Sequence, residues 1–323
     1  PCRMRMKCFR IGLHFAPGPA WFAKLAALLV TGLLALSAAA ADNEHATLIR
    51  EASLYASPAT SAERIAQVER GRDLVVLERK NADGNQTWMK VFVTITQGEN
   101  SRQVTGWLPA TPVVTSATMS ADQIIYGEAV NAEQEAERPR GRRGAAEDAL
   151  RLYQRVAEYF PNSPLAGEAT FRFADIRWQL DRAKNKGQTP VDEKLMQAVI
   201  QKFPGSKWAD LAAYDLLENK MCPEWRGLAD CPLKESTAYE LYAREHPRSP
   251  KVAEALYNAA WRQAALADIF RIQGQPASST AARNRAMALT QELASQLQPE
   301  WKTRAASLLY KLQQNIAVYG FSQ

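Results

Sequence analysis

The sequence predicts a multidomain α+β protein in which a small β-barrel is followed by an α-solenoid of helix pairs. Residues 44–115 contain short alternating apolar runs separated by turn signals, a pattern typical of strands. A short motif that contains proline then recurs every 43 residues, at Pro161, Pro204 and Pro247. Fixed periods of about 20–50 residues indicate stacked repeat units. We expect segments at 1–41, 42–115, 116–144 and 145–323.

Residues 1–41 have the composition of a secretory signal peptide. Five basic residues and no acidic one precede Asp42, an apolar run extends from Leu25 to Leu36, and small residues from Ser37 to Ala41 offer cleavage sites. An uncleaved membrane anchor is the alternative, although the run is shorter than the roughly 20 residues that span a membrane. We therefore expect a periplasmic or secreted protein, with association with the envelope left open.

The formal net charge of +6 comes mainly from this leader. After it, 35 basic residues are balanced by 34 acidic ones. A nearly neutral body does not indicate a nucleic-acid partner. Contact with a membrane is expected only through an uncleaved leader.

The segment 42–115 contains five candidate strands. Val, Ile, Leu and Thr alternate with polar residues, and residues 81–85 have the composition of a turn. Five short strands in about seventy residues suggest a small closed barrel. The candidates are Ala46–Ile49, Ile65–Val68, Leu74–Glu78, Trp88–Val93 and Val104–Leu108.

This segment resembles the bacterial SH3-like domains. The likeness rests on Leu54-Tyr55-Ala56-Ser57-Pro58, on the turn at Gly71, and on the closing run Thr105-Gly106-Trp107-Leu108-Pro109. Such domains are similar to modules that hold cell-wall peptides or proteins at the envelope. The resemblance therefore implies a binding role, with peptidoglycan as one alternative ligand.

Three aromatic residues, Tyr55, Trp88 and Trp107, are the candidate binding residues of this segment. Flat amphipathic rings suit peptide binding because they offer a large contact area at a low entropic cost. In so small a domain, the alternative is that the tryptophans belong to the core.

Residues 116–144 are expected to connect the two domains. A helix is predicted over Ala121–Glu137, with an apolar stripe that includes Ile124 and Ile125. Four arginines follow within six residues, and they form a candidate patch for phosphates or anionic lipid headgroups. The alternative is a solvated loop that proline and glycine keep irregular. These arginines are Arg138, Arg140, Arg142 and Arg143.

Each repeat unit is predicted to consist of a helix, a proline turn and a second helix. Apolar residues before Pro161 recur at helical spacing, and the proline ends that helix. Ser163 is expected to cap the next helix, with Pro164 at its first position. An ordinary helical bundle with coincidental prolines is the alternative. The predicted helices are 145–160, 164–183, 191–202, 206–219, 235–245, 249–273, 281–297 and 300–317.

The repeat region resembles the tetratricopeptide-like repeats of envelope proteins. It is similar to those of the outer-membrane assembly lipoprotein and of the Tol–Pal-associated periplasmic protein. The likeness rests on Tyr153, Ala157, Phe160-Pro161 and Ser163, and on their counterparts one and two periods later. It implies an α-solenoid that binds an envelope protein or peptide.

Cys222 and Cys231 are the cysteines that follow the leader. In an oxidising compartment we expect them to form a disulfide within one inter-helix loop. A redox pair or half of a zinc site is the alternative. The spacing is not C-x-x-C, and no histidine lies nearby at the spacing of a metal ligand.

Catalytic motifs are not evident in the sequence. After the leader the histidines are His45 and His246, and His246 occupies the position that Phe160 and Phe203 fill in the other repeats. These residues supply neither the converging ligands of a zinc amidase nor a cysteine–histidine pair. We predict no enzyme activity, no cofactor and no metal. The expected function is an exported non-catalytic scaffold; alternatives are a peptidoglycan-binding module and, more remotely, an accessory enzyme of wall hydrolysis.

Overall fold

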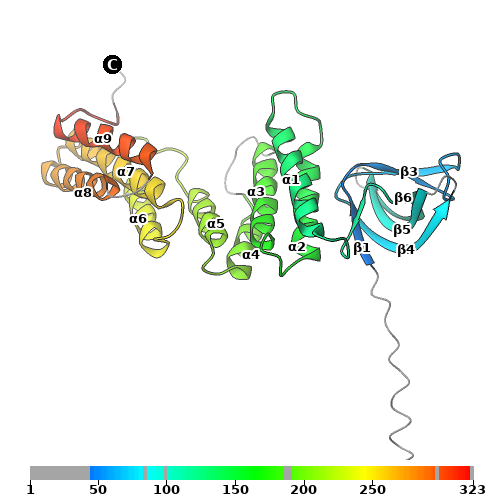
Figure 1. Cartoon of the computed structure of the whole chain (residues 1–323). Helices are drawn as coiled ribbons and strands as arrows, with labels where there is room; N and C mark the ends of the chain where they lie inside the picture. The colour runs from blue at the N-terminus through cyan, green and yellow to red at the C-terminus, as the bar shows by residue number, and fades with distance from the viewer. Residues whose placement is uncertain (1–43, 83–85, 98–99, 185–190, 295–297, 321–323) are drawn as a thin grey trace, which may run out of the picture. The chain divides into compact units, whose positions relative to one another are not determined.

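The computed structural model describes residues 44–82, 86–97, 100–184, 191–294 and 298–320. Within these ranges the chain forms seven antiparallel strands and then nine helices (Figure 1). The predicted α+β class is therefore confirmed. The expected signal peptide, residues 1–41, lies outside the described residues.

The strands form one antiparallel sheet with the order β3-β2-β6-β5-β4-β1-β7. Two of its strands, β2 and β7, are absent from the sequence prediction, because strands of 4 and 3 residues carry too little alternation to be recognised. The strands are β1 (Glu44–Leu48), β2 (Ala52–Tyr55), β3 (Arg64–Val68), β4 (Asp73–Ala82), β5 (Gln86–Gln97), β6 (Asn100–Pro109) and β7 (Val113–Thr115).

The core of the sheet is built from cross-strand pairs of apolar side chains. Leu74 on β4 lies opposite Val93 on β5, and all of Leu74, Val93 and Val91 are buried. On the other side of β5, Met89 lies opposite Leu108 of β6. Such pairs on one face are the stabilising unit of a sheet, because alternate side chains point to the same side.

The helices follow one another along the chain, and most pack against their neighbours in sequence. Helices α6 and α8 begin earlier than predicted, because Pro232 and Pro276 lie in their first turns, where a missing N–H costs nothing. The helices are α1 (Ala121–Glu137), α2 (Ala145–Tyr159), α3 (Ala166–Lys184), α4 (Lys194–Lys202), α5 (Lys207–Glu218), α6 (Asp230–Glu245), α7 (Val252–Ile272), α8 (Pro276–Ala294) and α9 (Pro299–Gln313).

The proline motif forms the same turn between two helices three times, and we call this turn the proline corner. The residue that ends the first helix has φ and ψ of −127° and 58° at Phe160, −128° and 54° at Phe203, and −119° and 55° at His246. Its N–H donates to the carbonyl four residues earlier in each case. Its own carbonyl then accepts from the N–H of the serine three residues later, which is Ser163, Ser206 or Ser249. The 43-residue sequence period is therefore also a period in backbone conformation.

Capping differs among the corners. The hydroxyl of Ser206 caps α5 by accepting from the Ala209 N–H at 3.2 Å. The predicted cap at Ser163 is wrong, because α3 begins only at Ala166 and Pro164 precedes it. The Ser163 hydroxyl accepts from the Leu165 N–H at 3.2 Å, ahead of the helix, and donates to Asp122 of α1 at 2.6 Å.

Helices α1 and α2 contact the turn between β3 and β4. The Arg151 Nε donates to the carbonyl of Arg70 at 2.7 Å, and Arg70 pairs with Glu128 of α1 at 2.6 Å. The Tyr159 hydroxyl at the end of α2 donates to the Ala46 carbonyl of β1 at 2.8 Å. These contacts connect the sheet to the first two helices.

Candidate functional site

The three aromatic residues of the sheet lie together, but two of them are buried. Trp88 is 2% exposed and Trp107 is 8% exposed, whereas Tyr55 is half-buried. Tyr55 lies opposite Trp107 in the register of β2 and β6, and its ring meets Trp88 edge-on at 5.7 Å between centroids. The alternative interpretation, that the tryptophans are core residues, describes this geometry. Only Tyr55 of the three offers a partly open ring.

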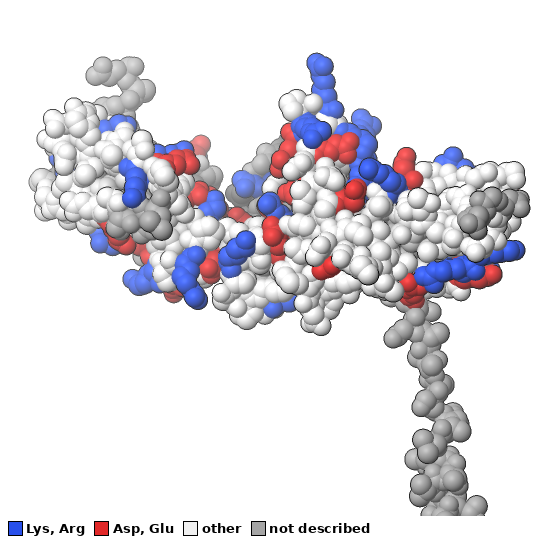
Figure 2. Space-filling view, in the orientation of Figure 1, with Lys and Arg blue, Asp and Glu red and all other residues white. Residues whose placement is uncertain are grey.

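The four arginines between α1 and α2 do not act as a single cluster. Arg142 donates to Glu135 and to Asp148, and its hydrogen bond with Asp148 raises the pKa of its guanidinium. The other three, Arg138, Arg140 and Arg143, are exposed, and their side chains have no partner within the described ranges. Figure 2 shows basic and acidic side chains mixed over the face that it displays.

A cavity of about 760 Å³ lies beside this loop. Five arginines and five acidic residues line it, so the lining has no excess of positive charge. Several of these residues pair with one another, as Arg151 does with Asp148 and Glu69. Binding of phosphates or anionic lipids by this loop stays a prediction.

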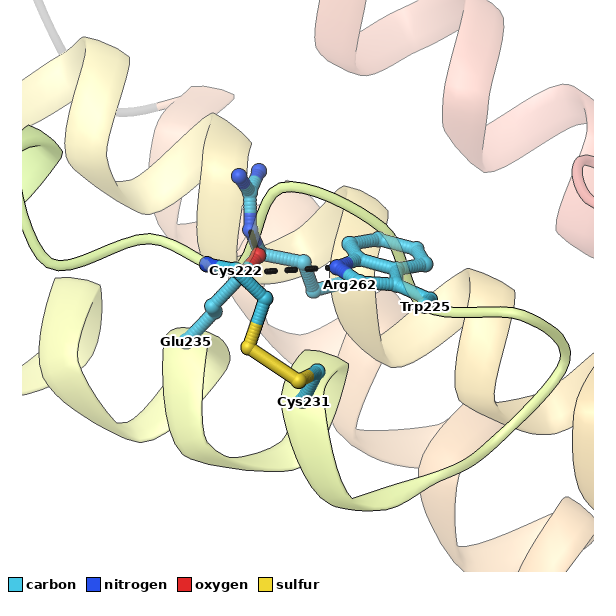
Figure 3. The surroundings of a disulfide bond; sticks show 5 residues. All are labelled: Cys222, Trp225, Cys231, Glu235 and Arg262. Carbon is cyan, nitrogen blue, oxygen red and sulfur yellow. Dashed lines mark hydrogen bonds and ion pairs between the residues drawn. A yellow bond between two sulfur atoms is a disulfide. The ribbon is translucent and has the colours of Figure 1, made fainter. Parts of the chain in front are cut away.

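Cys222 and Cys231 are joined by a disulfide, with their Cα atoms 6.1 Å apart (Figure 3). Cys222 lies in the loop after α5, but Cys231 is the second residue of α6. The prediction that one loop holds both cysteines is therefore wrong for Cys231, because α6 begins at Asp230. The disulfide connects this loop to the start of α6.

Glu235 organises the surroundings of the disulfide and was not singled out from the sequence. Its side chain is buried, and it accepts from the Cys222 N–H at 2.8 Å and the Trp225 indole N–H at 3.2 Å (Figure 3). Its other oxygen accepts from Arg262 Nε of α7 at 2.8 Å. A buried carboxylate needs such partners, because an unpaired buried charge is strongly destabilising. The sequence does not distinguish a buried glutamate on a helix, such as Glu235, from a solvent-exposed one.

A second pocket, of about 250 Å³, lies among α3, α5 and the start of α7. Trp178 and Tyr214 contribute aromatic side chains to it, and Asp215 contributes a half-buried carboxylate. Burial and the nearby charge of Asp175 raise the pKa of Asp215 to about 7. No sequence pattern indicates this pocket, because its residues come from three separate segments of the chain.

The two histidines of the described residues each face a carboxylate. His45 Nδ1 lies 3.1 Å from Asp73, and His246 Nδ1 lies 2.8 Å from Asp210. Across the described part of the chain, no three His, Cys, Asp or Glu side chains are grouped as they would be to hold a metal ion. Among the same residues, no helix combines the length and the apolar character needed to cross a membrane.

Comparisons with known proteins identify no family. No family model matches the chain, and no curated protein matches it. Among solved structures, the chain is similar to a de novo designed helical repeat protein at 17% identity, over 60% of this chain and 94% of that one, with a TM-score of 0.22.

Proposed function

We propose that this chain is an exported, non-catalytic scaffold that binds proteins or peptides at the cell envelope. In this proposal the sheet is a bacterial SH3-like barrel, and the helices from α2 onward form a TPR-like solenoid. The observation that carries it is the threefold recurrence of one corner, with the same backbone angles at Phe160, Phe203 and His246. Repeated helix pairs stack in one dimension and present extended surfaces, which suit binding to a partner chain.

The disulfide supports the exported location. Disulfides persist in oxidising compartments and are rare in the reducing cytosol. The bond between Cys222 and Cys231 closes a loop next to buried Glu235, so it belongs to a packed part of the protein. The composition of residues 1–41 supports the same location.

The location and the binding role can be tested in cells of the source organism with the tagged full chain. We expect the protein in the periplasmic or secreted fraction, with Cys222 and Cys231 protected from thiol alkylation until a reductant is added. Chemical crosslinking followed by affinity capture is expected to recover a small, reproducible set of envelope proteins. Cytosolic protein with freely alkylated thiols contradicts export, and crosslinking that recovers no envelope protein contradicts the scaffold role.

Binding to peptidoglycan is the alternative function, and it depends on Tyr55, since Trp88 and Trp107 are buried. Sedimentation with purified wall sacculi tests it. The alternative predicts that the wild-type chain pellets, that Tyr55→Ala does not, and that the matched variant Tyr310→Ala, which changes a 59% exposed tyrosine on α9, still pellets. A wild-type chain that stays in the supernatant eliminates this alternative.

A further inference from the structure

The pocket among α3, α5 and α7 joins equivalent parts of three successive repeats. Each of these helices is the one that follows a proline corner. Trp178 and Arg182 reach the pocket from α3 and Tyr214 and Asp215 from α5, while Lys251 lies directly before α7. A face shared by equivalent helices is continuous along a repeat array, so a pocket on it is open to a partner that lies along that array.

Most charged groups of the pocket have partners, but Asp215 does not. The Lys251 ammonium pairs with Glu254 at 2.6 Å, and Glu218 accepts from the Tyr239 hydroxyl. Within the described ranges, no hydrogen bond or ion pair reaches the half-buried Asp215 carboxylate. The site therefore contains a half-buried carboxyl with no hydrogen bond or ion pair of its own, although the Lys251 ammonium acts on it electrostatically.

The electrostatic surroundings of Asp215 favour the binding of a positive charge. Burial is the largest cause of its pKa near 7, and the carboxylates of Asp175, Glu218 and Glu254 add to it. Lys251 is the cation that opposes this shift. Arg182 also lines the pocket but is exposed. Near neutral pH a proton thus neutralises Asp215, and a bound cation would take over that role.

The aromatic side chains that line the pocket are almost fully buried, and one of them already contacts a cation of this chain. Trp178 is 7% exposed and Tyr214 is 3% exposed, so little of either ring is open to a ligand. The Lys251 ammonium already lies 5.1 Å from the centre of the Tyr214 ring. An ammonium within about 6 Å of an aromatic face is attracted by the ring quadrupole.

We propose that this pocket binds a primary ammonium group carried by the peptide or protein partner. The inference rests on the proposed scaffold function and specifies the chemistry that one of its sites recognises. The cavity of about 250 Å³ holds the end of a lysine side chain or a chain-terminal amine. The bound ammonium pairs with ionised Asp215.

The test uses the full chain and three small probes. N-acetyl-lysine N-methylamide carries a side-chain ammonium, alanine N-methylamide carries an α-ammonium, and N-acetyl-norleucine N-methylamide carries no charge. In calorimetric titrations we expect saturable binding of at least one ammonium probe and none of the norleucine probe. The preferred ammonium probe distinguishes a lysine side chain from a chain terminus. Equal binding of charged and uncharged probes overturns the proposal.

The role of Asp215 is tested by a matched pair of variants. Asp215→Asn is expected to lose the saturable binding, whereas Asp181→Asn, which removes a charge from α3 outside this pocket, is expected to keep it. With a pKa of about 7 for Asp215, the apparent affinity of the wild type for the lysine probe, which stays charged over this range, should rise roughly 30-fold between pH 5.5 and 8.5. Binding by Asp215→Asn with unchanged affinity overturns the proposal.

A measurement on the wild-type protein does not depend on any variant. Carboxyl carbon NMR of labelled aspartate follows the titration of Asp215, and a saturating ammonium probe is expected to lower its midpoint by about one pH unit or more. An unchanged midpoint overturns the proposal. If the probes fail while Asp215→Asn and wild type capture the same envelope proteins, the pocket inference fails and the scaffold function stands.

Discussion

Replacement of Gly71 by alanine tests how firmly the sheet is attached to the helices. Gly71 lies in the turn between β3 and β4 with φ of +73°, and an added Cβ would lie 2.6 Å from the Cβ of Arg151 and 3.0 Å from the backbone nitrogen of Leu152. The turn is also fixed by a hydrogen bond from the Gly71 N–H to the Leu48 carbonyl at 2.9 Å. The alanine methyl therefore meets the α2 backbone, which cannot rotate away.

Two separate costs add up at this position. A left-handed backbone costs an L-residue roughly 1–2 kcal/mol. Insertion of a methyl group into packed surroundings costs about 1–3 kcal/mol. We therefore expect Gly71→Ala to lower the free energy of unfolding by roughly 2–5 kcal/mol. A loss of this size is a large part of the stability of an ordinary domain, about 5–15 kcal/mol in total.

Two other glycines separate these costs in urea denaturation. Gly205 has φ of +71° with no atom within 4 Å of an added Cβ, so Gly205→Ala measures the backbone cost alone. Gly127 lies inside α1, again with nothing within 4 Å, and Gly127→Ala should stabilise the chain by up to about 1 kcal/mol. Of these three variants, only Gly71→Ala should increase the rate of amide hydrogen exchange in α2. If Gly71→Ala costs no more than Gly205→Ala, α2 does not pack on this turn and our reasoning is refuted.

Three further substitutions test the helices. Gly167→Ala places a Cβ 2.8 Å from Trp208 Cδ1 of α5. We expect this variant to have a lower melting temperature than the Gly127→Ala variant. Equal melting temperatures contradict the α3–α5 contact. Glu235→Gln removes the charge opposite Arg262 and should lower the free energy of unfolding, measured in urea, by about 3 kcal/mol. A loss below about 1 kcal/mol contradicts the buried ion pair. Folding raises the pKa of Asp215 from 3.8 to about 7, so the folded chain holds this proton more tightly than the unfolded chain does. The stability that the proton provides is therefore lost as the pH rises from 3.8 to about 7. Asp215→Asn should reduce the decline in thermal stability from pH 4 to 8, to which Asp175 also contributes because burial raises its pKa, and an unchanged decline contradicts the shift.

The repeat corners could be predicted because their causes are local. Proline removes an N–H and restricts the residue before it, so each helix ends where the sequence indicates, at Tyr159, Lys202 and Glu245. The same rule misplaced the starts of α6 and α8, where Pro232 and Pro276 lie inside a first turn. Proline marks a helix boundary in both settings, and context alone decides on which side of it the helix lies.

The sequence identified the aromatic residues of the sheet but not their exposure. Successive side chains of a strand point to opposite faces, so exposure depends on register and on what covers each face. Tyr55 and Trp107 are directly opposed across β2 and β6, yet Trp107 is buried and Tyr55 is half-buried. The register is irregular between Leu54 and Tyr55, where β3 carries one extra residue, Ile65, and this bulge has no sequence signal of its own.

The pocket around Asp215 shows why binding sites on repeats are harder to predict than the repeats themselves. Asp175, Asp215 and Glu254 belong to α3, α5 and the first turn of α7, and each by itself resembles a solvated helix residue. They act on one another because α3, α5 and the start of α7 meet at this pocket, and the sequence of each helix alone does not show that meeting. Like charges at half-buried positions destabilise the fold, and the packing of the helices offsets this destabilisation. A partner ammonium removes that cost on binding, so the instability of the free pocket is itself a source of affinity for a cationic partner.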